Sequence, residues 1–196
     1  MNELVELRKM LEENNGYVTT KQIRSLGIDS RGQKKLIDEK FLAKEAHGLY
    51  LGFDYFPDPF VKLQHQMPKA IFSHLTALFL HDLSDRDPLV YMLTIPTGSS
   101  SAHFKNNELR FFYNNDSLIQ AGVVEILSPS GSKIKVFDVE RTLCDCVKNI
   151  ERLDRDLVIT GLRRYLRSPM RKDSRLLEYA DLLKIRKEIY RYMEVL

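Results

Sequence analysis

The chain has 196 residues, 43% of them hydrophobic and 29% charged, with a net charge of +3 at pH 7. These values are ordinary for a soluble globular protein of one or two domains, whose core requires no disulfide or metal. No run approaches the roughly 18 apolar residues of a membrane span, and no basic leader precedes the first helical pattern. We therefore expect a cytoplasmic protein without a signal peptide and without membrane contact.

The positive charge is concentrated near the C-terminus. Residues 160–196 contain ten Lys and Arg residues against five acidic residues, whereas residues 1–52 are close to neutral. The two cysteines, Cys144 and Cys146, are two positions apart, so their side chains diverge and a mutual disulfide is not expected. Free thiols agree with a reducing compartment.

The first 52 residues predict a compact helical unit that ends in a hairpin. Apolar residues at helical spacing predict a helix over 2–14, which Gly16 terminates. Residues 17–18 are extended, and Thr19-Thr20 precedes a second short helix that Gly27 ends. Asp29 or Ser30 begins a third helix that reaches about Lys40. Two strand-like runs, 41–44 and 48–51, then flank a turn at 45–48.

Two helices joined by a tight glycine-containing turn and followed by a hairpin indicate a winged helix-turn-helix, so we expect double-stranded DNA as a partner. The third helix would place its N-terminal half in the major groove, the start of the second would face phosphates, and the hairpin would contact phosphate or the minor groove. The expected DNA-contacting residues of this unit are Thr20, Lys21, Ser30, Arg31, Gln33, Lys34, Lys35, Lys44 and His47. Winged helices also serve as protein-interaction modules, which is the alternative for this unit.

The remaining residues, 53–196, predict an α+β domain. The aromatic and proline-rich segment 52–60 is interpreted as a packed linker. Strands are expected at 71–72, 89–95, 109–113, 123–127 and 134–137, with an apolar helix from Ser73 or Thr76 to about His81. Helices follow, beginning at Asp138, at Asp154 or Asp156, at Asp173 and at Lys184.

Candidate catalytic and metal-binding groups are mostly discounted. Ser73, His74 and Asp82 resemble a hydrolytic triad, but no nucleophile elbow or oxyanion loop surrounds Ser73. His74 and His81 lack further ligands, the two cysteines lack a second pair, and the Thr97–Ser101 loop lacks the lysine of a phosphate-binding loop. We expect no enzymatic activity, no metal and no cofactor.

The basic C-terminal helices carry a one-signed excess of charge. Phosphate contact and a solvated surface remain alternatives of equal weight for them. The residues concerned are Arg163, Arg164, Arg167, Arg171, Lys172 and Arg175.

The chain as a whole resembles the AbiEi-type antitoxins, the antitoxin half of the bacterial type IV AbiE toxin–antitoxin modules for abortive infection and phage defence. The resemblance is carried by the N-terminal unit closing on residues 48–51, by the segments 70–78, 93–96 and 137–145, and by the terminal segment 190–196. The run Glu140-Arg141-Thr142-Leu143-Cys144-Asp145 is its most specific part, and the match covers nearly the whole chain.

The resemblance implies a repressor that binds repeats in its own promoter, and that counteracts a nucleotidyltransferase-like toxin without forming a stable complex. It assigns the antitoxic role and a contribution to cooperative DNA binding to the C-terminal domain. For Glu140, Arg141 and Asp145 we favour a buried ion-pair network that orients helices. No heptad or long apolar helix predicts dimerisation, so the sequence is compatible with a monomer.

Two other functions remain as alternatives. One is a transcriptional regulator whose C-terminal domain senses a small ligand, which a neighbouring toxin gene would argue against. The other is a nucleic-acid-modifying enzyme targeted by a winged helix, against which the missing metal and nucleotide motifs argue.

Overall fold

The computed structural model describes residues 2–101, 104 and 108–196, and it is an α+β protein of two compact units. Unit 1 contains residues 1–68 and 126–134, and unit 2 contains residues 69–125 and 135–196. Unit 1 thus extends beyond the boundary expected at residue 52 and includes a second, distant segment.

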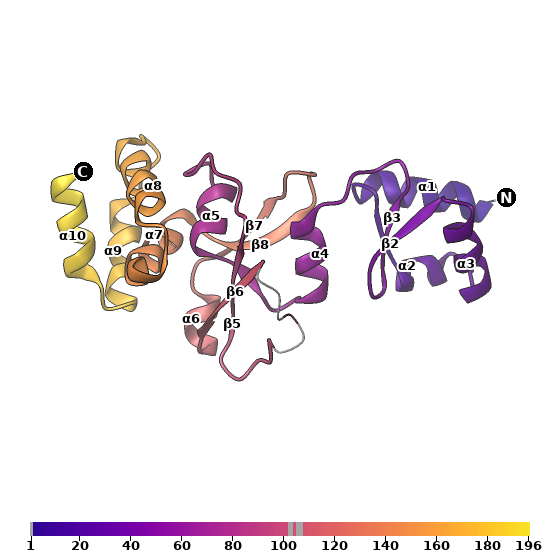
Figure 1. Cartoon of the computed structure of the whole chain (residues 1–196), viewed down its shortest axis with the longest axis horizontal. Coiled ribbons are helices and arrows are strands. Elements are labelled where there is room, and N and C mark those ends of the chain that lie inside the picture. Colours follow the sequence, from indigo (N-terminus) through magenta and orange to yellow (C-terminus); the bar gives the residue numbers. More distant parts are fainter. Residues whose placement is uncertain (1, 102–103, 105–107) are drawn as a thin grey trace. The chain divides into compact units, whose positions relative to one another are not determined.

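Unit 1 is built from short helices around a small antiparallel sheet in the order β1-β3-β2 (Figure 1). The expected local elements of its first 52 residues are confirmed, and the third helix ends two residues earlier than predicted. In chain order the elements are α1 (Asn2–Glu13), β1 (Tyr17–Thr19), α2 (Thr20–Ser25), α3 (Ser30–Asp38), β2 (Leu42–Ala46), β3 (Leu49–Gly52) and α4 (Pro59–Gln66).

The core of unit 1 contains residues from α1, β1, α2, α3, β2 and β3. Leu7 and Leu11 from α1 pack with Ile23, Leu36 and the strand residues around them. The turn after α1 needs a glycine, because Gly16 has a φ of +88° and a Cβ there would lie 2.3 Å from the ring of Tyr55.

Helix α4 was not predicted, and it begins at the end of the segment 52–60 that the sequence indicated as a linker, of which residues 53–58 form no helix or strand. Asp58 accepts a hydrogen bond from the Phe60 backbone N–H at 2.8 Å, and Pro59 occupies the first turn, where its missing N–H is not needed. The aromatic and proline content of this segment concealed an ordinary helix start. Asp58 is 4% exposed and also accepts a hydrogen bond from the Ser130 backbone, which ties the 126–134 segment into unit 1.

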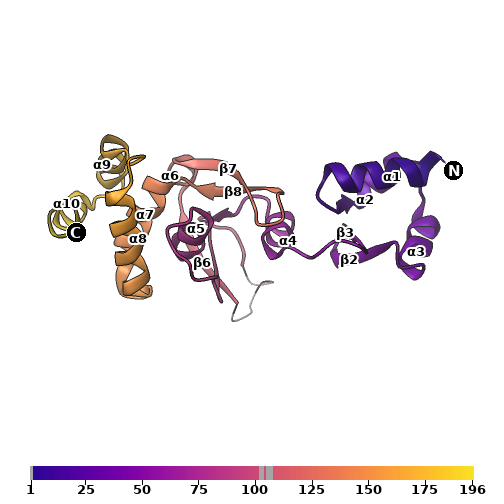
Figure 2. The ribbon, with the colours of Figure 1, turned by 90° about the horizontal axis from the view of Figure 1, so that it is seen from above.

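Unit 2 contains a mixed sheet in the order β6-β5-β4-β8-β7, followed by a group of packed helices (Figures 1 and 2). Strand β4 pairs antiparallel with β5 and parallel with β8, and β5 pairs parallel with β6. The elements are β4 (Ile71–Phe72), α5 (His74–Leu80), β5 (Tyr91–Pro96), β6 (Leu109–Asn114), α6 (Asp116–Gln120), β7 (Val123–Leu127), β8 (Lys133–Phe137), α7 (Val139–Lys148), a 3₁₀ turn (Ile150–Arg152), α8 (Arg155–Arg167), α9 (Asp173–Leu182) and α10 (Arg186–Val195).

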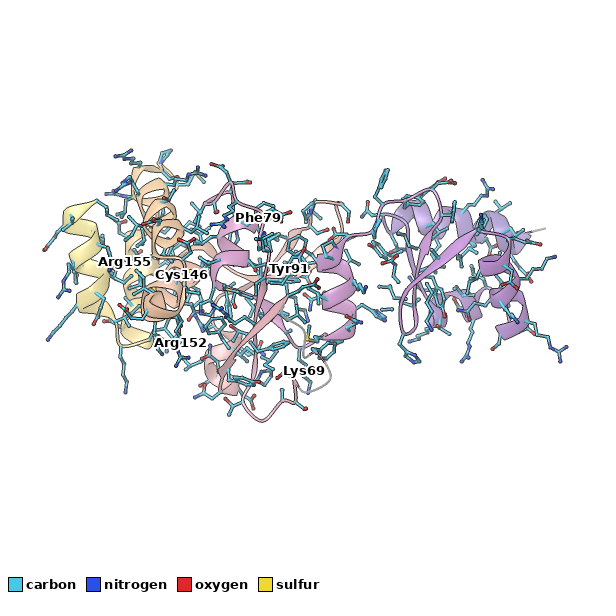
Figure 3. The ribbon with its side chains drawn as sticks, viewed as in Figure 1. Lys69, Phe79, Tyr91, Cys146, Arg152 and Arg155 are labelled. Carbon is cyan, nitrogen blue, oxygen red and sulfur yellow. The ribbon has the colours of Figure 1, made fainter. Side chains whose placement is uncertain are left out.

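Side-chain caps begin two of the long helices of unit 2, α7 and α8, whereas α9 and α10 begin without one. Asp138 begins α7 by accepting from the Arg141 backbone N–H at 2.8 Å, and Asp154 begins α8. The expected strands and long helices are confirmed within one to three residues at most ends, whereas α6 was not predicted. Helix α7 forms the centre of the helical core, where both cysteines are buried (Figure 3, which labels Cys146).

Candidate nucleic-acid interface

Helix α3 presents a cationic face to solvent in unit 1. Asp29 fixes its start, because the Asp29 carboxylate accepts from the Gly32 backbone N–H at 2.8 Å. Arg31 and Lys34 are exposed on the N-terminal half of the helix, and Lys35 is exposed in its last turn. Among the described residues, neither Arg31 nor Lys34 has an ion-pair partner, so both can accept an anionic one.

The opposite face of α3 is buried, and it includes one residue that was expected to contact DNA. Gln33 is only 8% exposed, and Leu36, three positions later, is 7% exposed. The expectation for Gln33 is therefore wrong, because this side chain belongs to the apolar stripe of the helix. The spacing of Gln33 from Leu36 and Ile37 was the available signal.

The start of α2 and the β2–β3 turn lie together. The Thr20 backbone N–H donates to the Gly48 carbonyl at 3.0 Å, so the hairpin turn is held against the first residue of α2. Lys21, on α2, is exposed, as are Lys44 on β2 and His47 in the turn, whereas Thr20 is half-buried. The turn is also fixed from the other side, because the His65 ring lies 3.1 Å from the His47 carbonyl.

The Gln22 side chain is engaged in the cap of α2 and is therefore not free to contact a nucleic acid. Thr19 and Gln22 form a reciprocal capping box, in which Gln22 Oε1 accepts from the Thr19 backbone N–H at 2.8 Å. The cap residue is thus Thr19, and Thr20 is the first residue of the helix. The remaining surface at this end is cationic through Lys21 and Arg24.

The acidic side chains of α3 lie at its C-terminal end. Asp38 is exposed, and Glu39 pairs with Lys35 at 3.7 Å with both side chains largely in solvent. A surface pair of this kind adds little stability and is readily exchanged for another anion. The positive charge of α3 is therefore concentrated where a major-groove helix contacts the bases.

The C-terminal basic residues of unit 2, for which phosphate contact and a solvated surface were alternatives, fall into two groups. Arg164 pairs with Asp85, Arg171 pairs with Asp173 at 3.4 Å, and Arg175 pairs with Asp138. The Arg175–Asp138 pair joins α9 to the start of α7, whereas the Arg164–Asp85 and Arg171–Asp173 pairs lie at the surface and add little stability. Within the described residues, Arg163, Arg167 and Lys172 are exposed and lack a carboxylate partner.

The motif that carries most of the family resemblance is built into the scaffold of unit 2. Arg141 is fully buried, and its Nε donates to Asp145 at 3.0 Å, as expected. Its Nη1 donates to the Leu118 and Ala121 carbonyls, both at 2.7 Å. Glu140 is not part of this ion pair, because it accepts a hydrogen bond from Tyr165 instead.

The same motif is anchored to α9 by Asp138. One carboxylate oxygen of Asp138 caps α7, and the other accepts from Arg175 at 2.6 Å and from Tyr179 at 2.8 Å. Burial raises the pKa of the Tyr179 hydroxyl, which stays protonated and able to donate. Arg175 therefore serves as a structural residue and not as a nucleic-acid contact.

Ser73, His74 and Asp82 do not come together as a triad. Ser73 and His74 are buried side by side, with the Ser73 Oγ 2.9 Å from His74 Nδ1, but Asp82 is exposed on the surface. His81 binds the Phe137 carbonyl at 2.7 Å, away from His74. Burial raises the pKa of both cysteine thiols, which disfavours the reactive thiolate.

No helix in the ranges 2–101 and 108–196 is long and apolar enough to cross a membrane. No cluster of three or more His, Cys, Asp or Glu side chains in that part of the chain could hold a metal ion.

The fold and surface thus define an α+β protein with a cationic helix face on unit 1 and a buried polar network in unit 2. Neither a protein-family model nor a curated protein matches the chain. Among solved structures, it is similar to the crystal structure of the RV2827C protein from Mycobacterium tuberculosis, with a TM-score of 0.63 and 11% sequence identity. That similarity covers 99% of this chain and 81% of the other, and at this identity it concerns the fold alone.

Proposed function

We propose that residues 2–52 form a winged helix-turn-helix that binds double-stranded DNA, with α3 in the major groove. The observation that carries this proposal is the exposed set of Arg31, Lys34 and Lys35 on α3, a helix that directly follows another helix and a glycine turn. The β2–β3 hairpin supplies the wing, with Lys44 and His47 on its exposed side. An arginine in this position can pair bidentately with guanine.

We further propose that the whole chain is an autoregulating antitoxin of the AbiEi type, which represses its own operon and counteracts a nucleotidyltransferase-like toxin. Support for this comes from the three motif segments, which meet in one place. Segment 70–78 forms β4 and α5, 93–96 lies on β5 beside β4, and 137–145 joins β8 to α7. Since α5 packs against α7, the residues of the resemblance are neighbours in unit 2.

The DNA-binding proposal predicts different effects for base-contacting and phosphate-contacting residues. Arg31→Ala should reduce the preference for promoter DNA over a scrambled duplex by about tenfold or more, because a bidentate base contact is lost. Lys21→Ala should weaken binding to both duplexes equally and lower the slope of log affinity against log salt by about one. Fluorescence anisotropy across a salt series measures both effects.

Lys9→Ala is the matched control for these variants, because Lys9 is an exposed cation on α1, outside the proposed interface. It should leave both the preference and the salt slope unchanged. If the wild-type chain binds promoter and scrambled DNA equally well, the operator-binding proposal fails and unit 1 is better explained as a protein-interaction module.

The antitoxin proposal predicts that repression and rescue are separable. A chain carrying Arg31→Ala and Lys34→Ala should lose repression of a promoter–reporter fusion but still restore growth to cells that express the neighbouring toxin gene. The physical reason is that both changes lie on the exposed face of α3 and leave the core of unit 2 intact. Absence of rescue by the wild-type chain contradicts the antitoxic role, whatever its DNA binding.

A further inference from the structure

Unit 2 contains a cavity of about 220 Å³. It lies beside β5 and β6, next to α5, the start of α8 and the segment 84–90. For comparison, an engineered protein cavity of about 150 Å³ holds a benzene molecule. The volume therefore suits a compact organic molecule rather than a nucleotide or a peptide.

Apolar side chains from α5, β5 and α8 line the cavity. Leu75 from α5, Met92 from β5 and Leu157 from α8 line it, together with Val90. Met92 and Arg110 are direct partners on the neighbouring strands β5 and β6, so both side chains lie on the same face of the sheet. The Arg110 guanidinium thus borders an apolar chamber.

The charges around the cavity are not all neutralised within the protein. Arg86 pairs with Asp154 at 3.1 Å, and Asp154 also caps α8 by accepting from the Asp156 and Leu157 backbone N–H groups. Arg86 and Asp154 are thus already paired with each other, with both side chains partly in solvent.

Arg110 and Asp87 differ from that pair. Arg110 donates through Nη1 to the Arg152 carbonyl at 2.8 Å, and no carboxylate among the described residues pairs with it (Figure 3 labels Arg152). Asp87 also lines the cavity and has no cationic partner within residues 2–101, 104 and 108–196. One unpaired cation and one unpaired anion therefore border the same apolar space.

We propose that this cavity binds a free α-amino acid with a compact apolar side chain. The carboxylate of the ligand would pair with Arg110, because a guanidinium accommodates a planar carboxylate through two parallel N–H donors. Its ammonium group would pair with Asp87, and its apolar side chain would contact Leu75, Val90, Met92 and Leu157. This site is independent of the proposed DNA-binding function.

The test is calorimetric titration of the full chain with three small molecules that differ in one group each. L-leucine carries both charges, 4-methylpentanoate lacks the ammonium group, and isopentylamine lacks the carboxylate. L-leucine should bind saturably, and each of the other two should bind about tenfold more weakly or worse, because one charged hydrogen bond is lost. Equal binding of 4-methylpentanoate and L-leucine would overturn the role of Asp87.

Variants locate the binding in this cavity. Arg110→Gln and Asp87→Asn should each weaken L-leucine binding about tenfold or more, whereas Arg163→Gln and Glu178→Gln, exposed positions elsewhere in unit 2, should not. Arg110 and Asp87 are themselves exposed, so their replacement leaves the core intact, which circular dichroism verifies. No saturable binding of L-leucine to the wild-type chain, or binding insensitive to both cavity variants, overturns the proposal.

Discussion

Replacement of Arg141 by methionine is expected to lower the free energy of unfolding by about 3–5 kcal/mol, the usual cost of removing one partner of a buried ion pair. Arg141 is fully buried, and its guanidinium also lies 4.3 Å from the centre of the Phe137 ring. The change leaves the Asp145 carboxylate unpaired and removes the donors from the Leu118 and Ala121 carbonyls. Urea denaturation measures the loss.

A second variant tests how much of this lost stability comes from the unpaired Asp145 carboxylate. Burial raises the pKa of the Asp145 carboxyl above its ordinary value, and Arg141 opposes that rise. The double variant Arg141→Met/Asp145→Leu removes the stranded acid and should recover part of the lost stability, but not all, because two carbonyls stay without donors. Recovery of nothing would mean that the ion pair is not the main cause. Arg163→Met, at an exposed position of α8, is the matched control.

Acidification is expected to destabilise the protein through His74. His74 is 2% exposed, and burial, followed by the charges of Arg141 and Arg110, lowers its pKa from 6.5 to about 3. The hydrogen bonds favour the neutral ring, because the Asn149 amide N–H donates to Nε2 at 3.1 Å and leaves Nδ1–H for Ser73. A proton on Nε2 would face another donor.

The sign of the effect follows from the lowered pKa. Below pH 6.5 the unfolded chain binds a proton at His74 that the folded chain excludes, so stability is complete above that pH and falls as the pH drops toward 3. The expected contribution of His74 to the loss of stability between pH 7 and pH 5 is about 2 kcal/mol. Denaturation curves at a series of pH values measure it against the variant His74→Asn.

Asparagine is the replacement of choice because His74 has a φ of +51°, a left-handed conformation that asparagine tolerates better than most residues. The variant should be less stable at pH 7, since the stacking of His74 on Phe112 is lost, but its stability should fall less between pH 7 and pH 5. His47→Asn, at an exposed turn position, controls for the loss of an imidazole. An unchanged pH slope in His74→Asn would show that His74 is not the source of the acid sensitivity.

The cationic face of α3 was predictable from sequence, because its exposed residues follow a capped helix start and a regular apolar stripe. The cap at Asp29 and the exposure of Arg31, Lys34 and Lys35 agree with that pattern. Gln33 was assigned to the wrong face because it was judged by its chemistry rather than by its spacing from Leu36. Helix α4 was missed although Asp58 and Pro59 form a standard helix start.

Local signals in the sequence determined where most helices and strands begin and end, because caps, glycine turns and apolar periodicity act within a few residues. The tertiary structure alone decided which of the charged side chains are free to bind a partner. Arg164 and Arg175 resemble Arg163 and Arg167 in sequence, yet their partners Asp85 and Asp138 lie far away along the chain. Ion pairing and burial depend on such distant contacts, so only the folded chain shows which of the C-terminal basic residues pair with carboxylates and which are exposed.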